Sequence, residues 1–218
     1  MKRCRGLLVG LLGLIPALGT TADLAVRVTD ARGAPVPDAV VTAVPRAGST
    51  VTASAPAASK MHIIDQTNET FVPYLEVFRP GDKVVFHNSD HTRHHAYSFA
   101  PARQFEFVLA PGESSTPLQL NQIGVIAVGC NIHDRMITYL YVTDAAFTAR
   151  TGNDGQARID LPAGSYDVRI WHPRQRPGAA DIVQTVTSAP HAPSADIAFV
   201  LALLPDQRKA PDRERSSY

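Results

Sequence analysis

Three side chains with metal-binding atoms occur close together near the middle of the chain, in the run Gly129-Cys130-Asn131-Ile132-His133-Asp134-Arg135-Met136. Cys130, His133 and Met136 offer a thiolate, an imidazole and a thioether at intervals of three residues. A soft thiolate, a nitrogen ligand and a weak axial thioether suit copper that cycles between two oxidation states. The spacing therefore predicts one short loop that supplies three ligands to a single type 1 copper ion.

A site of this kind needs a second histidine from a neighbouring strand. The segment from Asn88 to Phe99 contains His91, His94 and His95. Alternate residues of a strand face opposite sides, so His94 and His95 cannot both point into one site. The strand pattern alone leaves the choice between these two open.

The start of the chain has the order of a secretory signal peptide. Met1 to Arg5 is basic, Gly6 to Leu18 is apolar, and small residues follow through Ala22. This pattern predicts a signal peptide over residues 1–22, cleavage after Ala22 and a periplasmic protein. The apolar run is short for a bilayer span, and a retained anchor is the alternative. No later stretch approaches transmembrane length.

Removal of the signal takes Cys4 with it and leaves Cys130 as the one cysteine of the mature chain. A lone thiol in an exported protein needs an explanation. Metal ligation provides one, because a coordinated thiolate is held deprotonated and shielded from stray oxidation. The alternative, a buried inert thiol, does not account for the nearby His133 and Met136.

The composition predicts an all-β protein that binds no nucleic acid. Lys and Arg number 21 and Asp and Glu number 20, so no strong net charge favours a polyanionic partner. Short runs rich in Val, Thr and Tyr alternate with Gly, Pro, Asn and Asp, and no long stretch keeps a helical period. In the central region we expect strands over residues 61–64, 71–78, 83–87, 94–99, 105–109, 124–129 and 136–142. This density suits a β-sandwich with the copper loop at one end.

The central region resembles the cupredoxin superfamily, and within it bacterial plastocyanin-like proteins often labelled methylamine utilization proteins. The resemblance covers Met61 to Val142 and is carried by the Cys-x-x-His-x-x-Met loop, by His94-His95-Ala96 and by Gly81-x-x-Val84-x-Phe86-x-Asn88-x-Asp90. It implies a Greek-key sandwich in which His94 is the upstream ligand. His95 then takes the place of the usual asparagine that braces the copper loop.

The resemblance also implies supporting roles around the ligands for Asn88, His95 and Asn131. An imidazole at His95 can brace the copper loop only in part, which affects affinity and potential. Asp134 and Arg135 replace the Pro-aromatic pair common in that loop. The rim around His133 is therefore expected to be polar and to favour an electrostatically matched partner.

The flanking segments resemble a second small β-sandwich of the carboxypeptidase regulatory-like, transthyretin-like kind. The similarity lies in Val28-x-Asp30-x-x-Gly33-x-Pro35 and in Leu161-Pro162-Ala163-Gly164-Ser165-Tyr166. We expect the cupredoxin domain, residues 60–145, to be inserted in this sandwich or flanked by it. Residues 23–59 form its first part and a linker, residues 146–204 its remainder, and residues 205–218 a disordered tail.

Together these patterns predict a periplasmic, non-enzymatic carrier of single electrons with a redox protein partner such as a cytochrome. The alternative is a copper store, delivery protein or sensor without fast electron transfer. A catalytic Cys-His pair would need an orienting group and room for substrate, and structural zinc prefers more than one cysteine. His62, His87, His91, His172 and His191 are interpreted as solvated residues without a function.

Overall fold

The computed structural model describes residues 21–47, 58–189, 195–206 and 208. In this part of the chain the strands are β1 (Thr21–Asp30), β2 (Val40–Pro45), β3 (Met61–Thr67), β4 (Thr70–Val72), β5 (Leu75–Phe78), β6 (Lys83–Asn88), β7 (His94–Ser98), β8 (Phe105–Leu109), β9 (Leu118–Gln119), β10 (Gly124–Cys130), β11 (Ile137–Val142), β12 (Phe147–Arg150), β13 (Gln156–Pro162), β14 (Gly164–Trp171), β15 (Ile182–Ser188) and β16 (Ala195–Leu201). The all-β class expected from the sequence is confirmed. The described residues contain no helix that could cross a membrane.

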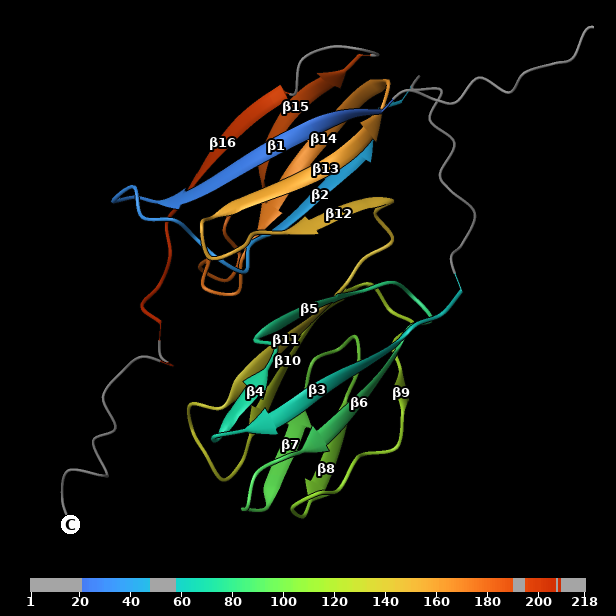
Figure 1. The fold of residues 1–218 in the computed structure, drawn as a ribbon, viewed down its shortest axis with the longest axis vertical. Helices are drawn as coiled ribbons and strands as arrows, with labels where there is room; N and C mark the ends of the chain where they lie inside the picture. The colour runs from blue at the N-terminus through green and yellow to red at the C-terminus, as the bar shows by residue number, and fades with distance from the viewer. Residues whose placement is uncertain (1–20, 48–57, 190–194, 207, 209–218) are drawn as a thin grey trace, which may run out of the picture.

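Strands β3 to β11 form one sandwich of two sheets, in the lower half of Figure 1. One sheet has the order β5-β11-β10-β7-β8 and the other the order β4-β3-β6-β9. Inward-facing side chains of both sheets share one core, which includes Phe71, Phe86, Ile126 and Leu140. Burial of such a continuous apolar face, at roughly 25 cal/mol per Å², is the main contribution to the stability of a sandwich.

The second sandwich is built from both ends of the chain. Its sheets have the orders β13-β1-β16 and β12-β2-β14-β15, so β1 and β2 pair with strands that follow the first sandwich. Strand β1 pairs with β13 in antiparallel register and with β16 in parallel register. The segment β3 to β11 therefore lies between two sequence halves of one sandwich, and these halves share a core that includes Val28, Val41, Val168 and Phe199.

Aromatic and charged side chains join the two sandwiches. Trp171 at the end of β14 packs against Tyr139 and Tyr141 of β11, with ring centroids 6.2 and 5.1 Å apart. Arg150 of β12 donates from Nη1 to the backbone carbonyl of Leu75 at 3.0 Å. These contacts cover the outer face of the β5-β11 edge and leave the opposite end of the first sandwich free of the second.

The structure refines the expected elements at a few positions. The single strand expected over residues 71–78 is two strands, because Pro73, which lacks a backbone N–H, stands between β4 and β5. The short β9 had no sequence signal. Strand β1 begins at Thr21, so cleavage after Ala22 would remove its first two residues.

The chain ends lie partly outside the described residues. The predicted signal peptide falls there up to residue 20, as do residues 48–57 of the predicted linker. Part of the segment expected to be a disordered tail is placed, since the Arg208 guanidinium lies 3.3 Å from the ring centroid of Tyr74 and Asp206 contacts Arg208.

Candidate metal centre

His94 and Cys130 come from neighbouring strands of the five-stranded sheet. Strands β7 and β10 are antiparallel, with Cys130 opposite Ala96. Along β7 the buried residues are His94, Ala96 and Ser98, so His94 points into the sandwich on the same face as Cys130. Alternation along this strand thus places His94 inside and His95 on the outer face.

The loop from Asn131 to Met136 is closed by backbone hydrogen bonds. Cys130 N donates to Met136 O at 3.1 Å, and Met136 N donates to His133 O at 3.0 Å. Asn131 N donates to His95 O at 3.0 Å, which ties the loop to β7. These bonds turn the chain tightly enough to bring His133 back beside Cys130.

The structure brings one ligand atom from each of His94, Cys130 and His133 within 4.8 Å of one another. Cys130 Sγ lies 3.8 Å from His94 Nδ1 and 3.7 Å from His133 Nδ1. With metal–nitrogen and metal–sulfur bonds of about 2.0 and 2.3 Å, as in zinc sites, two ligands at a trigonal angle stand about 3.7 Å apart. The spacing and the His2Cys chemistry therefore fit a trigonal copper ion.

His94 is fully buried, and its second ring nitrogen has a carboxylate partner. Nε2 lies 2.8 Å from Asp90 Oδ2, so Nε2 carries the hydrogen and Nδ1 presents a lone pair towards Cys130. Burial raises the pKa of Asp90, but hydrogen bonds from Glu69 N, His94 and Asn68 N outweigh it and hold that pKa below its usual value. An ionised carboxylate therefore fixes the tautomer that metal binding needs.

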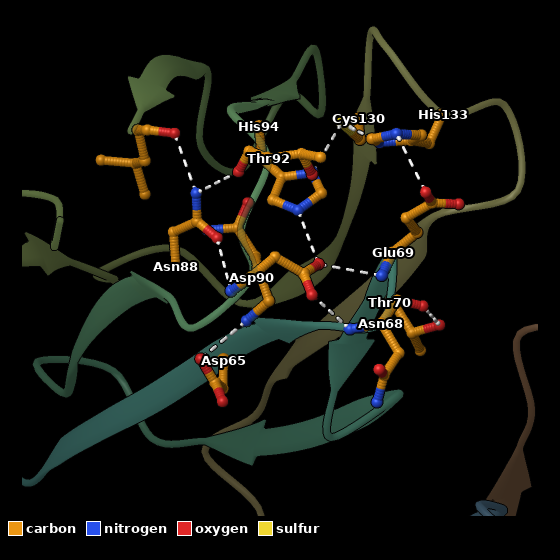
Figure 2. A network of polar contacts seen from close by, with 12 residues as sticks. Asp65, Asn68, Glu69, Thr70, Asn88, Asp90, Thr92, His94, Cys130 and His133 are labelled. Carbon is orange, nitrogen blue, oxygen red and sulfur yellow. Dashed lines mark hydrogen bonds and ion pairs between the residues drawn. The ribbon is translucent and has the colours of Figure 1, made fainter. Parts of the chain in front are cut away.

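His133 stands at the solvent edge of the site. Its side chain is 22% exposed, and Nε2 lies 3.8 Å from Glu69 Oε1 while Nδ1 faces Cys130 (Figure 2). Cys130 is buried and free of disulfides. The predicted donor set thus has one ring at the surface and the remaining donors inside.

Met136 is 2% exposed and belongs to the same apolar core as Cys130. Its backbone contacts with Cys130 and His133 place the residue at the base of the loop. Axial ligation by its thioether stays a prediction from the sequence.

The three residues expected to support the ligands lie around the site in different ways. Asn88 is fully buried; its Nδ2 donates to Thr92 O and Leu109 O, and its Oδ1 accepts from Asp90 N. The His95 ring contacts Glu106 Oε1 at 2.6 Å on the outer face. The contacts that tie β7 to the loop therefore run through the backbone of His95 and Asn131 rather than the His95 ring.

The histidines that were interpreted as solvated residues lie in different environments. His87 contacts Ser114, and His62 lies between Glu76 and Asp82. The interpretation of His172 as a solvated residue is wrong: it is 3% exposed, because it packs at the end of β14, and burial lowers its pKa to about 4. His191 lies outside the described residues.

Sequence reasoning assigned no role to Asp90 or Glu69. The spacing Asp90-x-x-x-His94 could have suggested the first contact, since the two residues are four apart. Glu69 carried no local signal, because its neighbour His133 follows much later in the chain.

No protein-family model matches the chain, and no curated protein matches it in sequence. Among solved structures, the chain is similar to a purple cupredoxin from Nitrosopumilus maritimus, with 17% identity, a TM-score of 0.34 and coverage of 38% of this chain and 99% of that one. It is also similar to amicyanin from Paracoccus versutus (13% identity, TM-score 0.34, covering 47% of this chain and 98% of that one).

A third solved structure is the Cu-containing nitrite reductase (NirK) from Thermus scotoductus SA-01. The match has 22% identity and a TM-score of 0.34, and covers 46% of this chain and 25% of that one. Each of the three alignments covers less than half of this chain, so the likeness concerns only part of it.

Proposed function

We propose that this protein is a periplasmic type 1 copper protein that carries single electrons between redox partners. The observation that carries the proposal is the convergence of His94 Nδ1, Cys130 Sγ and His133 Nδ1 within 4.8 Å. His94, Cys130 and His133 would hold the ion, with Met136 as a weak axial ligand. Copper supplies, when bound, a one-electron couple between its two oxidation states.

The chain's own residues suit this role in three respects. The donors sit on paired strands and on a loop closed by backbone hydrogen bonds, so a change of oxidation state should move them little. Cys130 and Met136 are buried, which keeps water from the sulfur atoms. The exposed edge of His133 is where a partner can approach most closely.

The geometry favours a carrier over an enzyme, because the buried donor set leaves a single ring edge at the surface. The rim of this edge carries Glu69, Asp134 and Arg135, so an electrostatically matched protein such as a periplasmic cytochrome is the expected partner. The export of the chain is inferred from its first 22 residues.

Rapid-mixing kinetics would separate a carrier from a copper store or delivery protein. The copper-loaded chain should be reduced by a small reduced cytochrome within milliseconds to seconds and reoxidised without loss of the ion. A delivery protein would instead bind Cu(I) and release it to a chelator, with slow electron exchange. Release of copper in each reduction cycle would contradict the proposal.

A further inference from the structure

Both predicted imidazole ligands lie between the Cys130 sulfur and a carboxylate. His94 has Asp90 Oδ2 at 2.8 Å from Nε2, and His133 has Glu69 Oε1 at 3.8 Å from Nε2. The Nδ1 atom of each ring faces Cys130 Sγ. Figure 2 shows this arrangement, with one carboxylate behind each ring.

The Asp90 carboxylate is fixed from several directions. Oδ1 accepts a hydrogen bond from Asn68 N at 2.6 Å, and Oδ2 accepts one from Glu69 N at 2.9 Å. The backbone N–H of Asp90 donates to Oδ1 of the fully buried Asn88 at 3.0 Å. Because both oxygens have backbone donors, the chain itself fixes the position of the carboxylate.

The same backbone donors position the second carboxylate. Asn68 and Glu69 form the turn between β3 and β4 with positive φ angles of 52° and 54°, as in the tight turns of hairpins. With the N–H groups of both residues directed at Asp90, the Glu69 side chain extends towards His133. Asp90 therefore links the turn that carries Glu69 to the ring of His94.

We propose that Asp90 is a positioning residue that holds His94 in its Nε2–H tautomer and, together with Glu69, biases the centre towards Cu(II). This inference rests on the proposed copper site. A carboxylate hydrogen-bonded to a ligand histidine makes the ring a stronger donor. A nearby negative charge also stabilises the more positive of two oxidation states. The protein is then a carrier that is readily oxidised and needs a comparatively strong reductant as its electron donor.

The two carboxylates should differ in strength. The His94 side chain is fully buried and Asp90 is 14% exposed, so solvent ions screen this pair little. Glu69 is 41% exposed and lies farther from its ring, so its effect should be small and should decrease with salt. Neutralising Asp90 should therefore change the copper centre more than neutralising Glu69 does.

The test measures the reduction potential and the Cu(II) and Cu(I) affinities of the copper-loaded protein and of four variants. Asp90→Asn should lower the Cu(II) affinity by about 10–100-fold, because an amide that donates to Nε2 pushes the ring hydrogen onto the metal-facing Nδ1. Each tenfold loss of Cu(II) affinity relative to Cu(I) raises the potential by about 59 mV. Glu69→Gln should lower the ratio of Cu(II) to Cu(I) affinity by only a few-fold, and this effect should vanish at high salt.

Glu76→Gln is the matched control, since it removes one negative charge beside His62 rather than beside a predicted ligand. It should leave the potential unchanged. Asp90→Glu, which keeps the charge, should restore most of the wild-type value. Nitrogen NMR shifts of His94 in the copper-free protein should report Nε2–H in the wild type and Nδ1–H in Asp90→Asn.

The outcomes separate the two proposals. If the wild type binds copper with a thiolate band and folded Asp90→Asn has the same potential and the same His94 tautomer, the inference is overturned while the proposed function stands. A wild type that binds no Cu(II) overturns both. Should Asp90→Asn fail to fold, a salt-independent or absent effect of Glu69→Gln would contradict the role assigned to that carboxylate.

Discussion

The Nδ1 atom of His94 lies 3.8 Å from the Sγ atom of Cys130, although 36 residues separate the two in the chain. The antiparallel pairing of β7 and β10 creates this contact, because it sets Cys130 opposite Ala96, two residues from His94 on the same face. The predicted metal centre depends on this sheet register and on the packing of the sandwich around it.

Replacing the upstream histidines one at a time should identify the ligand. His94→Ala removes a buried ring directed at Cys130, so the intense thiolate-to-copper absorption should be lost or strongly reduced. His95→Ala removes a ring that contacts Glu106 on the outer face, and the absorption should stay close to the wild-type level. Visible absorption during Cu(II) titration measures both. Loss of the absorption in His95→Ala but not in His94→Ala would mean that β7 presents its other face to the metal.

Met136→Leu should retain copper but raise its reduction potential. Leucine fills nearly the same volume, so the core around residue 136 should stay intact. Loss of a weak axial donor disfavours Cu(II) more than Cu(I), and the potential should rise. Electrochemistry of the loaded variant provides the measurement. An unchanged potential and EPR spectrum would show that the thioether only fills the core.

Trp171→Ala should weaken the packing between the two sandwiches. The ring contacts Tyr139 and Tyr141, and truncation of a half-buried tryptophan should cost about 1–3 kcal/mol, less than the full burial value. Urea unfolding followed by far-UV circular dichroism measures this change. Trp171→Phe, which keeps an aromatic ring, is the control and should lose less. Equal stability of wild type and alanine variant would contradict packing through this residue.

His172 should make the protein less stable in mild acid. Its pKa is lowered to about 4 in the folded chain, by burial first and by Arg174 second, with a hydrogen bond to the Pro37 carbonyl opposing the shift. Between pH 6.5 and 4 the unfolded chain takes up a proton that the folded chain does not. Stability therefore falls as pH decreases, by at most about 3 kcal/mol from this group.

The comparison for His172 is His172→Asn, in which the amide oxygen can accept the hydrogen bond from Arg174 N. Unfolding free energies measured from pH 7 to pH 4 should fall less steeply for the variant than for the wild type. Parallel curves for the two proteins would show that His172 is protonated equally in both states.

The sequence predicted the parts of the site that depend on local patterns. Cys130, His133 and Met136 lie in one short loop, so their spacing is visible in the sequence. Alternation along β7 places His94 and His95 on opposite faces of the strand. Most strands of the first sandwich were expected within a few residues of their observed bounds, since Gly, Pro, Asn and Asp separate the strand-forming runs. The break at Pro73 was missed, because the residues on either side are both strand-forming.

The carboxylates behind the rings could not be predicted in the same way. The contact of Glu69 with His133 requires the β3–β4 turn and the copper loop to meet at one end of the sandwich. The turn and the loop belong to different sheets, so their contact depends on how the two sheets pack. The sequence of a single segment does not show this packing. The burial of His172 is similar, since it depends on strand β14 lying against the loop that contains Pro37.

Copper ligation itself is best tested by the absorption and EPR spectra of the chain without residues 1–22 as Cu(II) is added. We predict an intense visible band that saturates at one ion per chain and is absent from Cys130→Ser, because the band arises from the bond between sulfur and copper. A Cys130→Ser protein that keeps the colour, or a wild type that stays colourless with excess Cu(II), would contradict the assignment of His94, Cys130 and His133 as ligands.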